Sequence, residues 1–223
     1  MAPGWVLVLA GVSQPLEWAE FPPIIDVMVV VGLGLAAIQF LPGFFARGLE
    51  SLYVSSWYIL GALVFTLLAY PMGNIVPEVV AGASGAAFSG LWIHDAVGLF
   101  VTPLALAIIY FVIPAATGRP IFSHFLSMLG FWLLFFLYPL NGTHHYVFSV
   151  IPMAAQMGAI TASTLLGLDV LIVVNVPAQL MAKPLDAQNW PLAVFGLLAA
   201  AGSLCISRVI FRRAMLSYRS ASS

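Results

Sequence analysis

Residues 121–145 read IFSHFLSMLGFWLLFFLYPLNGTHH, a mostly apolar run that ends in a polar segment with two histidines. The apolar part, residues 121–140, has the length of about 20 residues that a helix needs to cross the hydrocarbon of a bilayer. Backbone groups in lipid must be satisfied within the segment, which favours a helix. The stretch therefore predicts a transmembrane helix with two histidines just beyond its end.

The composition of the whole chain also indicates a membrane protein. Of its 223 residues, 62% are hydrophobic and 7% are charged, with a mean hydropathy of +1.07. A soluble domain has about a quarter of its residues charged. The net charge of -1 provides no basic surface for a nucleic acid. Cys205 is the single cysteine, which excludes an intrachain disulfide and a thiolate cluster.

Five further apolar stretches are long enough to span a bilayer, at residues 24–46, 52–71, 89–115, 151–180 and 190–211. We therefore predict an all-α, multi-pass bundle of about six transmembrane helices. The transmembrane domain covers residues 24–211, between an N-terminal lead-in at 1–23 and a C-terminal tail at 212–223. The lead-in carries no basic residue ahead of its apolar part, so we expect no cleavable signal peptide.

Basic residues in the short loops predict the orientation. Arg47, Arg119 and Lys183 follow the first, third and fifth segments, which end on one face, and the loop at 72–88 on the other face has no basic residue. The positive-inside rule makes the first of these faces cytoplasmic. The last segment disagrees and leaves its own orientation open, because its end carries Arg208, Arg212, Arg213 and Arg219.

Four side chains at the opposite, outer face form a candidate site between residues 89 and 148. His94 lies near the start of the third segment, and Tyr138, His144 and His145 lie at or beyond the end of the fourth. On this prediction His94 is about 8 Å from its helix end, within reach of the Tyr138 hydroxyl. Three imidazoles suit copper, zinc and iron alike. The alternative is an interfacial belt of amphipathic rings.

Five short motifs resemble the catalytic subunit of C-type (cbb-type) heme-copper cytochrome oxidases, over roughly residues 45–165. They are YVSSWY at 53–58, WIHD at 92–95, GRPI at 118–121, FW at 131–132 with Tyr138, and GTHH at 142–145. The resemblance implies that His94, His144 and His145 bind the active-site copper. It also implies that Tyr138 is covalently joined to His94 and supplies an electron and a proton for splitting dioxygen.

Gly98 favours the C-type subfamily. A-type and B-type oxidases have the active-site tyrosine four residues after the first copper histidine, and related nitric oxide reductases have an iron-binding glutamate there. This chain has Gly98 at that position, with its tyrosine at 138. It departs from the family's usual Gly-His-Asn in having Ile93 and Asp95 around His94, which leaves the ligand itself in place.

The family's catalytic subunit has many more helices and binds two hemes through further histidines. This sequence has four histidines, and His124 is the one left over. Our hypothesis is a central portion of a split subunit, with heme ligated mainly by partner chains that include c-type cytochromes. The implied function is reduction of dioxygen to water with electrons from cytochrome c, coupled to proton translocation, in a bacterial-type cytoplasmic membrane.

Three other functions remain open at this point. One is a degenerate, non-catalytic oxidase-like subunit. A second is a rhomboid-like intramembrane protease that uses Ser84 of GASG at 82–85, although the last segment has no histidine base, without which serine is a poor nucleophile. The third is a non-catalytic membrane partner or transporter with helices broken by prolines.

A proton path to the site is a further hypothesis. Ser127 precedes Tyr138 by three helical turns on the same face, and His124 lies one turn earlier. Alternatively, Ser127 back-bonds to its helix and His124 lies at the interface beside Arg119. Asp169 is predicted to be the acid deep within an apolar segment, where acids are functional candidates. It could instead pair with Asn175, Ser163 or a neighbouring chain.

Overall fold

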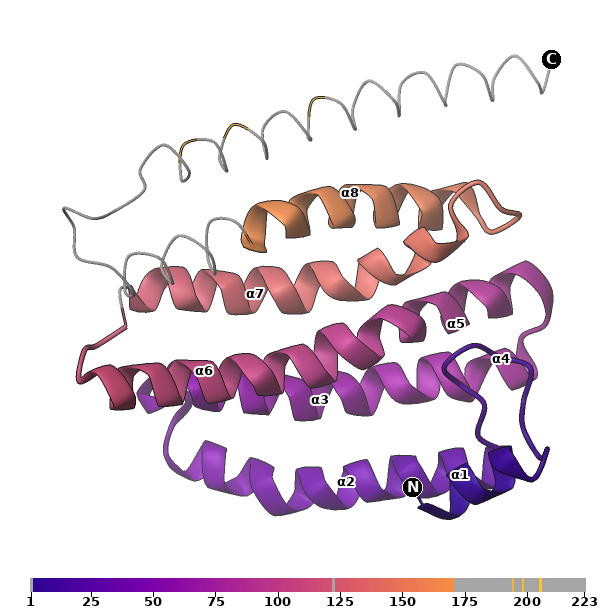
Figure 1. The fold of residues 1–223 in the computed structure, drawn as a ribbon, viewed down its shortest axis with the longest axis horizontal. Helices are drawn as coiled ribbons and strands as arrows, with labels where there is room; N and C mark the ends of the chain where they lie inside the picture. The colour runs from indigo at the N-terminus through magenta and orange to yellow at the C-terminus, as the bar shows by residue number, and fades with distance from the viewer. Residues whose placement is uncertain (1, 122, 171–193, 195–197, 199–204, 206–223) are drawn as a thin grey trace.

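The structure, a computed structural model, describes residues 2–121, 123–170, 194, 198 and 205 (Figure 1). The regular elements in this part are helical, which confirms the predicted all-α class. In chain order they are α1 (Ala2–Leu9), α2 (Pro23–Ala46), η1 (Leu49–Ser51), α3 (Val54–Asn74), α4 (Val76–Val79), α5 (Gly82–Asp95), η2 (Ala96–Val101), α6 (Thr102–Thr117), α7 (His124–Asn141), η3 (Gly142–Tyr146) and α8 (Met153–Asp169).

Four helical stretches of the described residues are long and apolar enough to cross a membrane. They are Pro23–Ala46, Val54–Val79, Gly82–Thr117 and His124–Tyr146, and they confirm the first four predicted segments. Helix α8 covers the first part of the fifth, while the rest of the fifth and nearly all of the sixth lie outside the described residues. The long helices lie side by side and alternate in direction, so that the start of α5, η3 and the start of α8 share one end (Figure 1).

Helix α5 begins at Gly82 rather than near residue 89. The prediction failed there because residues 82–87 are small and weakly apolar, which hydropathy reads as a loop. Packing requires a small residue at Gly85, because a Cβ there would overlap the Val80 carbonyl oxygen. His94 therefore lies about 18 Å from the start of its helix, instead of the expected 8 Å.

An aromatic cluster fixes α7 against α3. Tyr58, Phe131 and Phe135 are all at most 2% exposed, and the rings of Tyr58 and Phe131 meet edge to face with centroids 5.5 Å apart. Such pairs add about 0.5–1.5 kcal/mol beyond their burial. A Cβ at Gly61 would lie 2.5 Å from the Phe135 ring, so glycine there allows α7 to approach. This packing determines where the end of α7, and hence Tyr138, is held.

A π-helical turn, η2, joins α5 to α6 immediately after His94 and Asp95. Pro103 follows it at the start of α6, and proline has no N–H to donate to the carbonyl four residues earlier. That carbonyl belongs to Leu99, and it accepts a hydrogen bond from the Thr66 hydroxyl of α3 at 3.3 Å. The wider turn is therefore held in place from α3. Such π turns occur frequently at functional sites.

The N-terminal segment is attached to the bundle by buried polar contacts. Asp26 at the start of α2 is fully buried. Its carboxylate accepts hydrogen bonds from the Tyr70 hydroxyl at 2.7 Å and from the Gln14 amide at 3.3 Å. The Trp92 indole N–H donates to the Trp18 carbonyl at 2.9 Å. Residues 14–26 are thereby joined to α3 and α5 at the end of the bundle where α5 begins.

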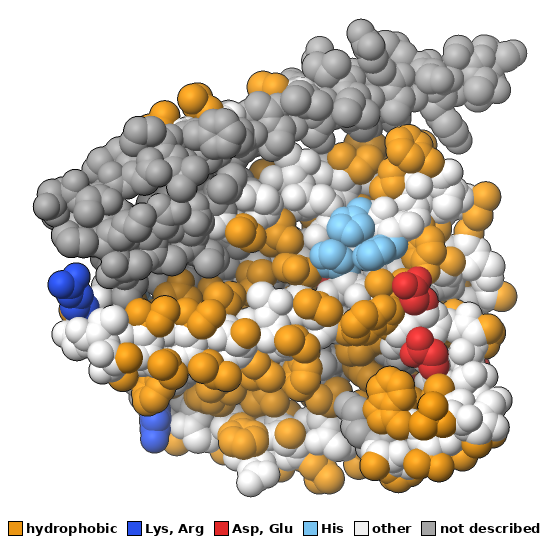
Figure 2. Space-filling view, viewed as in Figure 1, with side chains coloured by type: hydrophobic (Ala, Val, Ile, Leu, Met, Phe, Trp, Pro, Cys, Tyr) orange, Lys and Arg blue, Asp and Glu red, His pale blue; other side chains and the backbone are white. Residues whose placement is uncertain are grey.

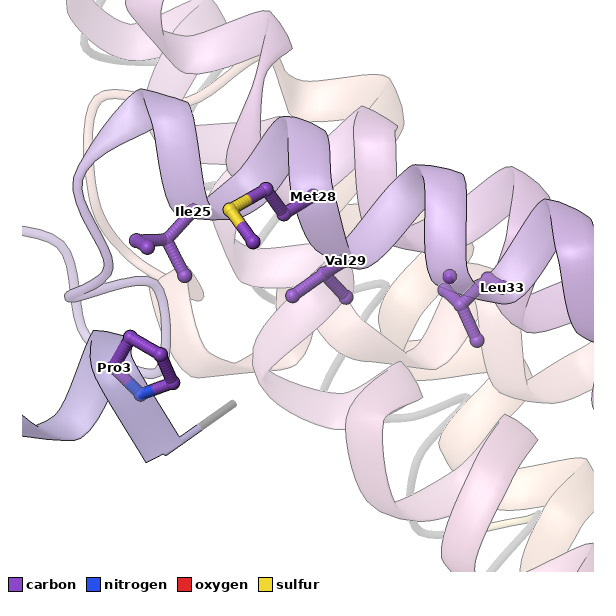
Figure 3. Close-up of a pocket in the computed structure, with 6 residues that line it drawn as sticks. Pro3, Ile25, Met28, Val29 and Leu33 are labelled. Atoms are coloured by element: carbon purple, nitrogen blue, oxygen red, sulfur yellow. The ribbon is translucent and has the colours of Figure 1, made fainter.

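A small apolar pocket lies between α1 and α2 (Figure 3). Its lining consists of Pro3, Ile25, Met28, Val29, Gly32 and Leu33. These side chains offer no titratable or metal-binding group. We therefore assign the pocket to packing of α1 on α2 and not to the candidate site.

Candidate metal centre

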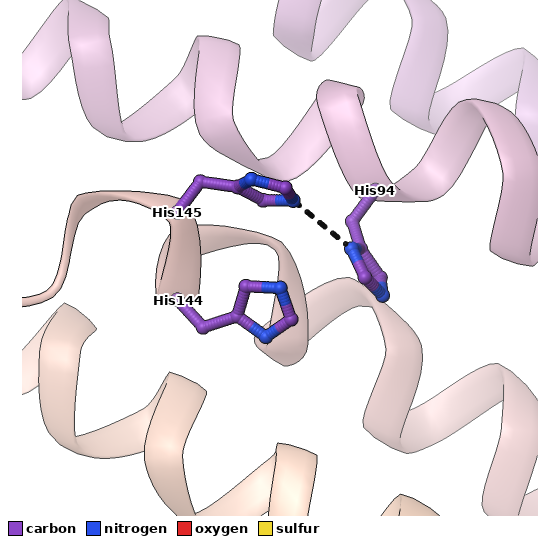
Figure 4. Close-up of side chains that lie close together, drawn as sticks. All are labelled: His94, His144 and His145. Atoms are coloured by element: carbon purple, nitrogen blue, oxygen red, sulfur yellow. Dashed lines mark hydrogen bonds between the residues drawn. The ribbon is translucent and has the colours of Figure 1, made fainter.

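The three histidines predicted to form a site converge in the structure. His94 projects from α5, and His144 and His145 project from η3 toward it (Figure 4). One nitrogen from each ring lies within 4.8 Å of the others. The ring centroids are 4.6 Å apart for His94 and His144, 5.5 Å for His94 and His145, and 4.6 Å for His144 and His145. Residues separated by fifty positions in sequence are thus brought to one point.

Two glycines permit this convergence. A Cβ at Gly142 would lie 2.6 Å from the Gly90 carbonyl oxygen and from the Leu91 Cα, and a Cβ at Gly90 would lie 2.5 Å from the Tyr146 ring. Helix α5 and η3 can therefore pack backbone against backbone. The 3₁₀ geometry of η3 then allows its two adjacent histidines to turn toward the same place. Helix α7 continues to Asn141, with Pro139 in its last turn, before η3 begins at Gly142.

Tyr138 stacks on His94, with ring centroids 4.8 Å apart and planes at 30°. Its ring lies directly against Gly98, where any Cβ would overlap the Cδ1, Cε1 and Cγ atoms of Tyr138. Gly98 is four residues after His94, one helical turn further along the same face. The phenol of α7 therefore fills the space that a side chain at position 98 would occupy. The position of the Tyr138 ring therefore requires glycine at position 98.

Gly98→Ala is expected to destabilise the protein by about 1–3 kcal/mol, the usual range for adding a methyl group to a filled interior. Position 98 is buried in the π turn, so the added carbon has no free space. It must displace the Tyr138 ring from its stacked position on His94. Thermal unfolding in detergent would measure the change. The matched control is Gly34→Ala on α2, where a Cβ meets no atom within 4 Å and alanine favours the helix. Equal unfolding midpoints for the two variants would contradict the overlap.

The three rings suit a metal that prefers nitrogen ligands. His94 Nδ1 lies 3.2 Å from His145 Nε2, close to the roughly 3.5 Å between two nitrogens that each bind one ion at about 2.0–2.1 Å. Three neutral imidazoles without a carboxylate or thiolate are the ligand type of copper or zinc rather than of magnesium or calcium. Two rings are half-buried and His145 is exposed, and Figure 2 shows the histidines as one surface patch.

Two polar side chains that the sequence did not identify contact these rings. Asn141 Nδ2 lies 2.9 Å from His94 Nε2, and Ser163 Oγ lies 2.9 Å from His144 Nδ1. Asn141 and Ser163 are also hydrogen-bonded to each other. Ser163 lies on the next helix, α8, with no sequence motif linking it to the histidines.

Comparison with known proteins identifies the family. The family model described as Cytochrome C and Quinol oxidase polypeptide I matches residues 1–210. The chain belongs to this family. The match extends well beyond residues 45–165, where the motif resemblance was found.

Curated members of the oxidase subunit I family are similar along most of this chain. It is 31% identical to cytochrome c oxidase subunit 1 of Rhodobacter capsulatus, over 70% of this chain and 33% of the relative. It is 31% identical to the cbb3-type cytochrome c oxidase subunit CcoN1 of Stutzerimonas stutzeri, over 73% and 38%. A subunit 1 homologue of Bradyrhizobium diazoefficiens is 32% identical, over 71% and 31%. The chain spans about a third of the length of these relatives.

Apolar helices and bacterial subunit I relatives make this chain an integral membrane protein of the oxidase family. The rhomboid alternative does not fit its structure either. Ser84 is exposed in the first turn of α5, and no hydrogen bond joins it to a histidine within the described part of the chain. A serine without a base is not activated as a nucleophile.

Two residues of the predicted proton path, Ser127 and His124, lie toward the start of α7, away from the three histidines. Ser127 is 5% exposed and donates to the Ser123 carbonyl at 2.9 Å, which is the back-bonding that we considered as its alternative. His124 is exposed at the first residue of α7, and Asp169 is the last residue of α8. Ser163, which the sequence offered as a partner for Asp169, contacts His144 and Asn141.

Asp169 is not the single acid within the membrane-spanning part, as the sequence suggested. Asp26 is fully buried in α2 and Asp95 is 3% exposed in α5. The Oδ1 atom of Asp95 has no hydrogen-bond partner in the described residues. Both acids lie near the starts of their predicted segments, 24–46 and 89–115, and we did not predict their burial. Tertiary packing covers both side chains.

Proposed function

We propose that this chain is part of the catalytic core of a respiratory terminal oxidase that reduces dioxygen to water with electrons from cytochrome c. In this proposal His94, His144 and His145 bind the active-site copper and Tyr138 is the active-site tyrosine. The observation that supports it most is the convergence of three imidazoles beside a stacked phenol, in a member of the oxidase subunit I family.

Copper bound here would supply a one-electron redox couple next to a heme iron. The chain's own residues hold that position: three neutral rings provide nitrogen lone pairs and leave the positive charge of an ion uncompensated in an apolar setting. Such a charge favours anionic or electron-rich groups beside it. The Tyr138 phenol, packed on His94, is placed to give up a proton and an electron toward the same point.

Heme is supplied from outside these residues, and we propose one or more partner chains as its source. Among the described residues, His124 is the one histidine outside the cluster, and it lies at the start of α7, the end away from η3. His124 alone cannot ligate both of the hemes that the family binds through histidines. The exposure of His145 supports an arrangement in which another polypeptide brings a heme against the histidine patch of Figure 2.

We further propose that the copper site faces the outside of a bacterial cytoplasmic membrane. The described basic residues are Arg47 and Arg119, and they lie at the end of the bundle opposite the histidines, while acidic side chains lie near the histidines (Figure 2). Arg and Lys are enriched in short loops on the cytoplasmic side of the membrane. The protons consumed at the site, and any that are pumped, would then be taken up from the Arg119 end.

Ser127→Ala tests the proton path from that end. Ser127 and Tyr138 share a face of α7, and loss of the hydroxyl removes one carrier between them. We expect oxygen consumption by the assembled complex to slow by about tenfold, equivalent to about 1.4 kcal/mol of barrier, with copper content unchanged. An unchanged rate would show that the hydroxyl only back-bonds to Ser123, as its 2.9 Å contact allows. His124 and Asp169 remain weaker candidates for this path.

The proposal as a whole is tested by purifying the complex that contains this chain from its native membrane. Metal analysis of the complex should detect copper, and its optical spectrum should show heme. When the chains are separated, heme should be found on the partner chains. Oxygen uptake with reduced cytochrome c should be catalysed. Stoichiometric heme on this chain alone would overturn the division between chains, and a complex without copper would overturn the function.

A further inference from the structure

Ser163 lies where it can control one of the three histidines. It is on α8, a helix that supplies none of the three rings, and its hydroxyl oxygen lies 2.9 Å from His144 Nδ1. The same oxygen lies 2.7 Å from the Ala159 carbonyl and in hydrogen-bond contact with Asn141 Oδ1. Three contacts therefore meet at one hydroxyl group.

Proton counting at this hydroxyl determines the tautomer of His144. A serine hydroxyl has one proton and two lone pairs. Its proton is directed to acceptors, the Ala159 carbonyl or Asn141 Oδ1. The contact with His144 must then be one in which the ring donates and the serine oxygen accepts. A neutral imidazole has one N–H, so Nδ1 of His144 carries it and Nε2 keeps a free lone pair.

This conclusion does not depend on the orientation of the Asn141 amide. If the amide is turned over, its nitrogen donates to Ser163 Oγ in place of its oxygen accepting. The serine proton then goes to Ala159, and both serine lone pairs are filled by His144 and Asn141. In either orientation, His144 is the donor. One atom of the Asn141 side-chain amide is hydrogen-bonded to Ser163, and the other lies 2.9 Å from His94 Nε2.

We propose that Ser163 is a positioning residue for the metal centre, which fixes His144 as an Nε2 ligand and holds its ring toward the other two histidines. This inference rests on the proposed function and adds to it a residue from α8. A ligand imidazole whose other N–H is hydrogen-bonded is held in orientation and is more basic. Helix α8 thereby becomes part of the site.

The test is the copper affinity of the purified complex, measured by competition with a copper(I) chelator. Ser163→Ala removes the acceptor of His144 Nδ1–H and should weaken copper binding by about 10–100-fold, the usual effect of losing such a partner. Ser163→Thr keeps the hydroxyl and the back-bond to Ala159, and should restore affinity to near the wild-type value. Copper X-ray absorption should show greater disorder of the nitrogen shell in Ser163→Ala alone.

A matched control is Thr117→Val, which removes a hydroxyl bonded to the Ile113 carbonyl at 2.8 Å at the far end of α6, and should leave copper affinity unchanged. Asn141→Leu gives a second route if Ser163→Ala does not assemble, with an expected loss of the same order. Wild-type affinity in both Ser163→Ala and Asn141→Leu would overturn this inference alone. A wild-type complex that binds no copper would overturn the proposed function, and this inference with it.

Discussion

His144→Ala is expected to deprive the assembled complex of its active-site copper and to reduce oxygen uptake to background. One of three convergent rings is lost, and the two that remain, His94 and His145, cannot complete the nitrogen shell. The loss of copper affinity should exceed the roughly 10–100-fold effect of losing a residue that only orients a ligand. Copper per complex by elemental analysis and oxygen uptake by electrode measure the two effects.

His124→Ala is the matched control for copper content. It removes an identical ring from the exposed start of α7, far from the cluster, and should leave copper stoichiometry unchanged. If His144→Ala keeps full oxidase activity, the catalytic copper is held elsewhere. The chain would then be the degenerate, non-catalytic member of the family that the sequence alone left open.

Tyr138→Phe should also lose turnover but, unlike His144→Ala, should retain copper. The phenylalanine ring keeps the 4.8 Å stacking on His94 and the packing over Gly98. The change removes the hydroxyl, so the site loses its local source of a proton and an electron. Loss of a positioned proton donor costs about 10²–10⁴-fold in rate. Steady-state oxygen uptake, normalised to copper content, measures this loss.

The alternative role for Tyr138 is purely structural, as a ring that fills the space beside Gly98. Under that role Tyr138→Phe would turn over at the wild-type rate, since the two rings have nearly the same volume. Tyr138→Ala distinguishes the roles further: it leaves a cavity beside His94 and should cost about 3–5 kcal/mol of stability. A Phe variant as unstable as the Ala variant would contradict the packing described here.

The candidate site could be predicted largely because its residues lie at the ends of consecutive apolar segments. Segments that cross a membrane in alternate directions place such ends on one face, so His94 and the pair at 144 and 145 had to be near each other. The sequence was less informative about how far His94 lies from the start of its helix. Residues 82–87 are small, and at Gly85 the backbone packs closely against Val80, so hydropathy misjudged the start of α5 and the position of His94 within it.

Buried polar groups were also misjudged, for a related reason. Asp26 lies at the start of the predicted segment 24–46 and was not singled out from the sequence, yet Tyr70 and Gln14 donate to its carboxylate from elsewhere in the chain. Hydropathy scores each residue by its own side chain. A partner that compensates a buried acid is found only when the segments have been placed against each other.

The sequence by itself determined that the protein lies in a membrane, that its helices include the four described spans, and which histidines converge, because these depend on the order and length of apolar segments. The tertiary structure decided that the Tyr138 ring fills the space over Gly98 and that Ser163 reaches His144 from α8. Those contacts join different helices, and their distances depend on how side chains fill the shared interior rather than on any spacing along the chain.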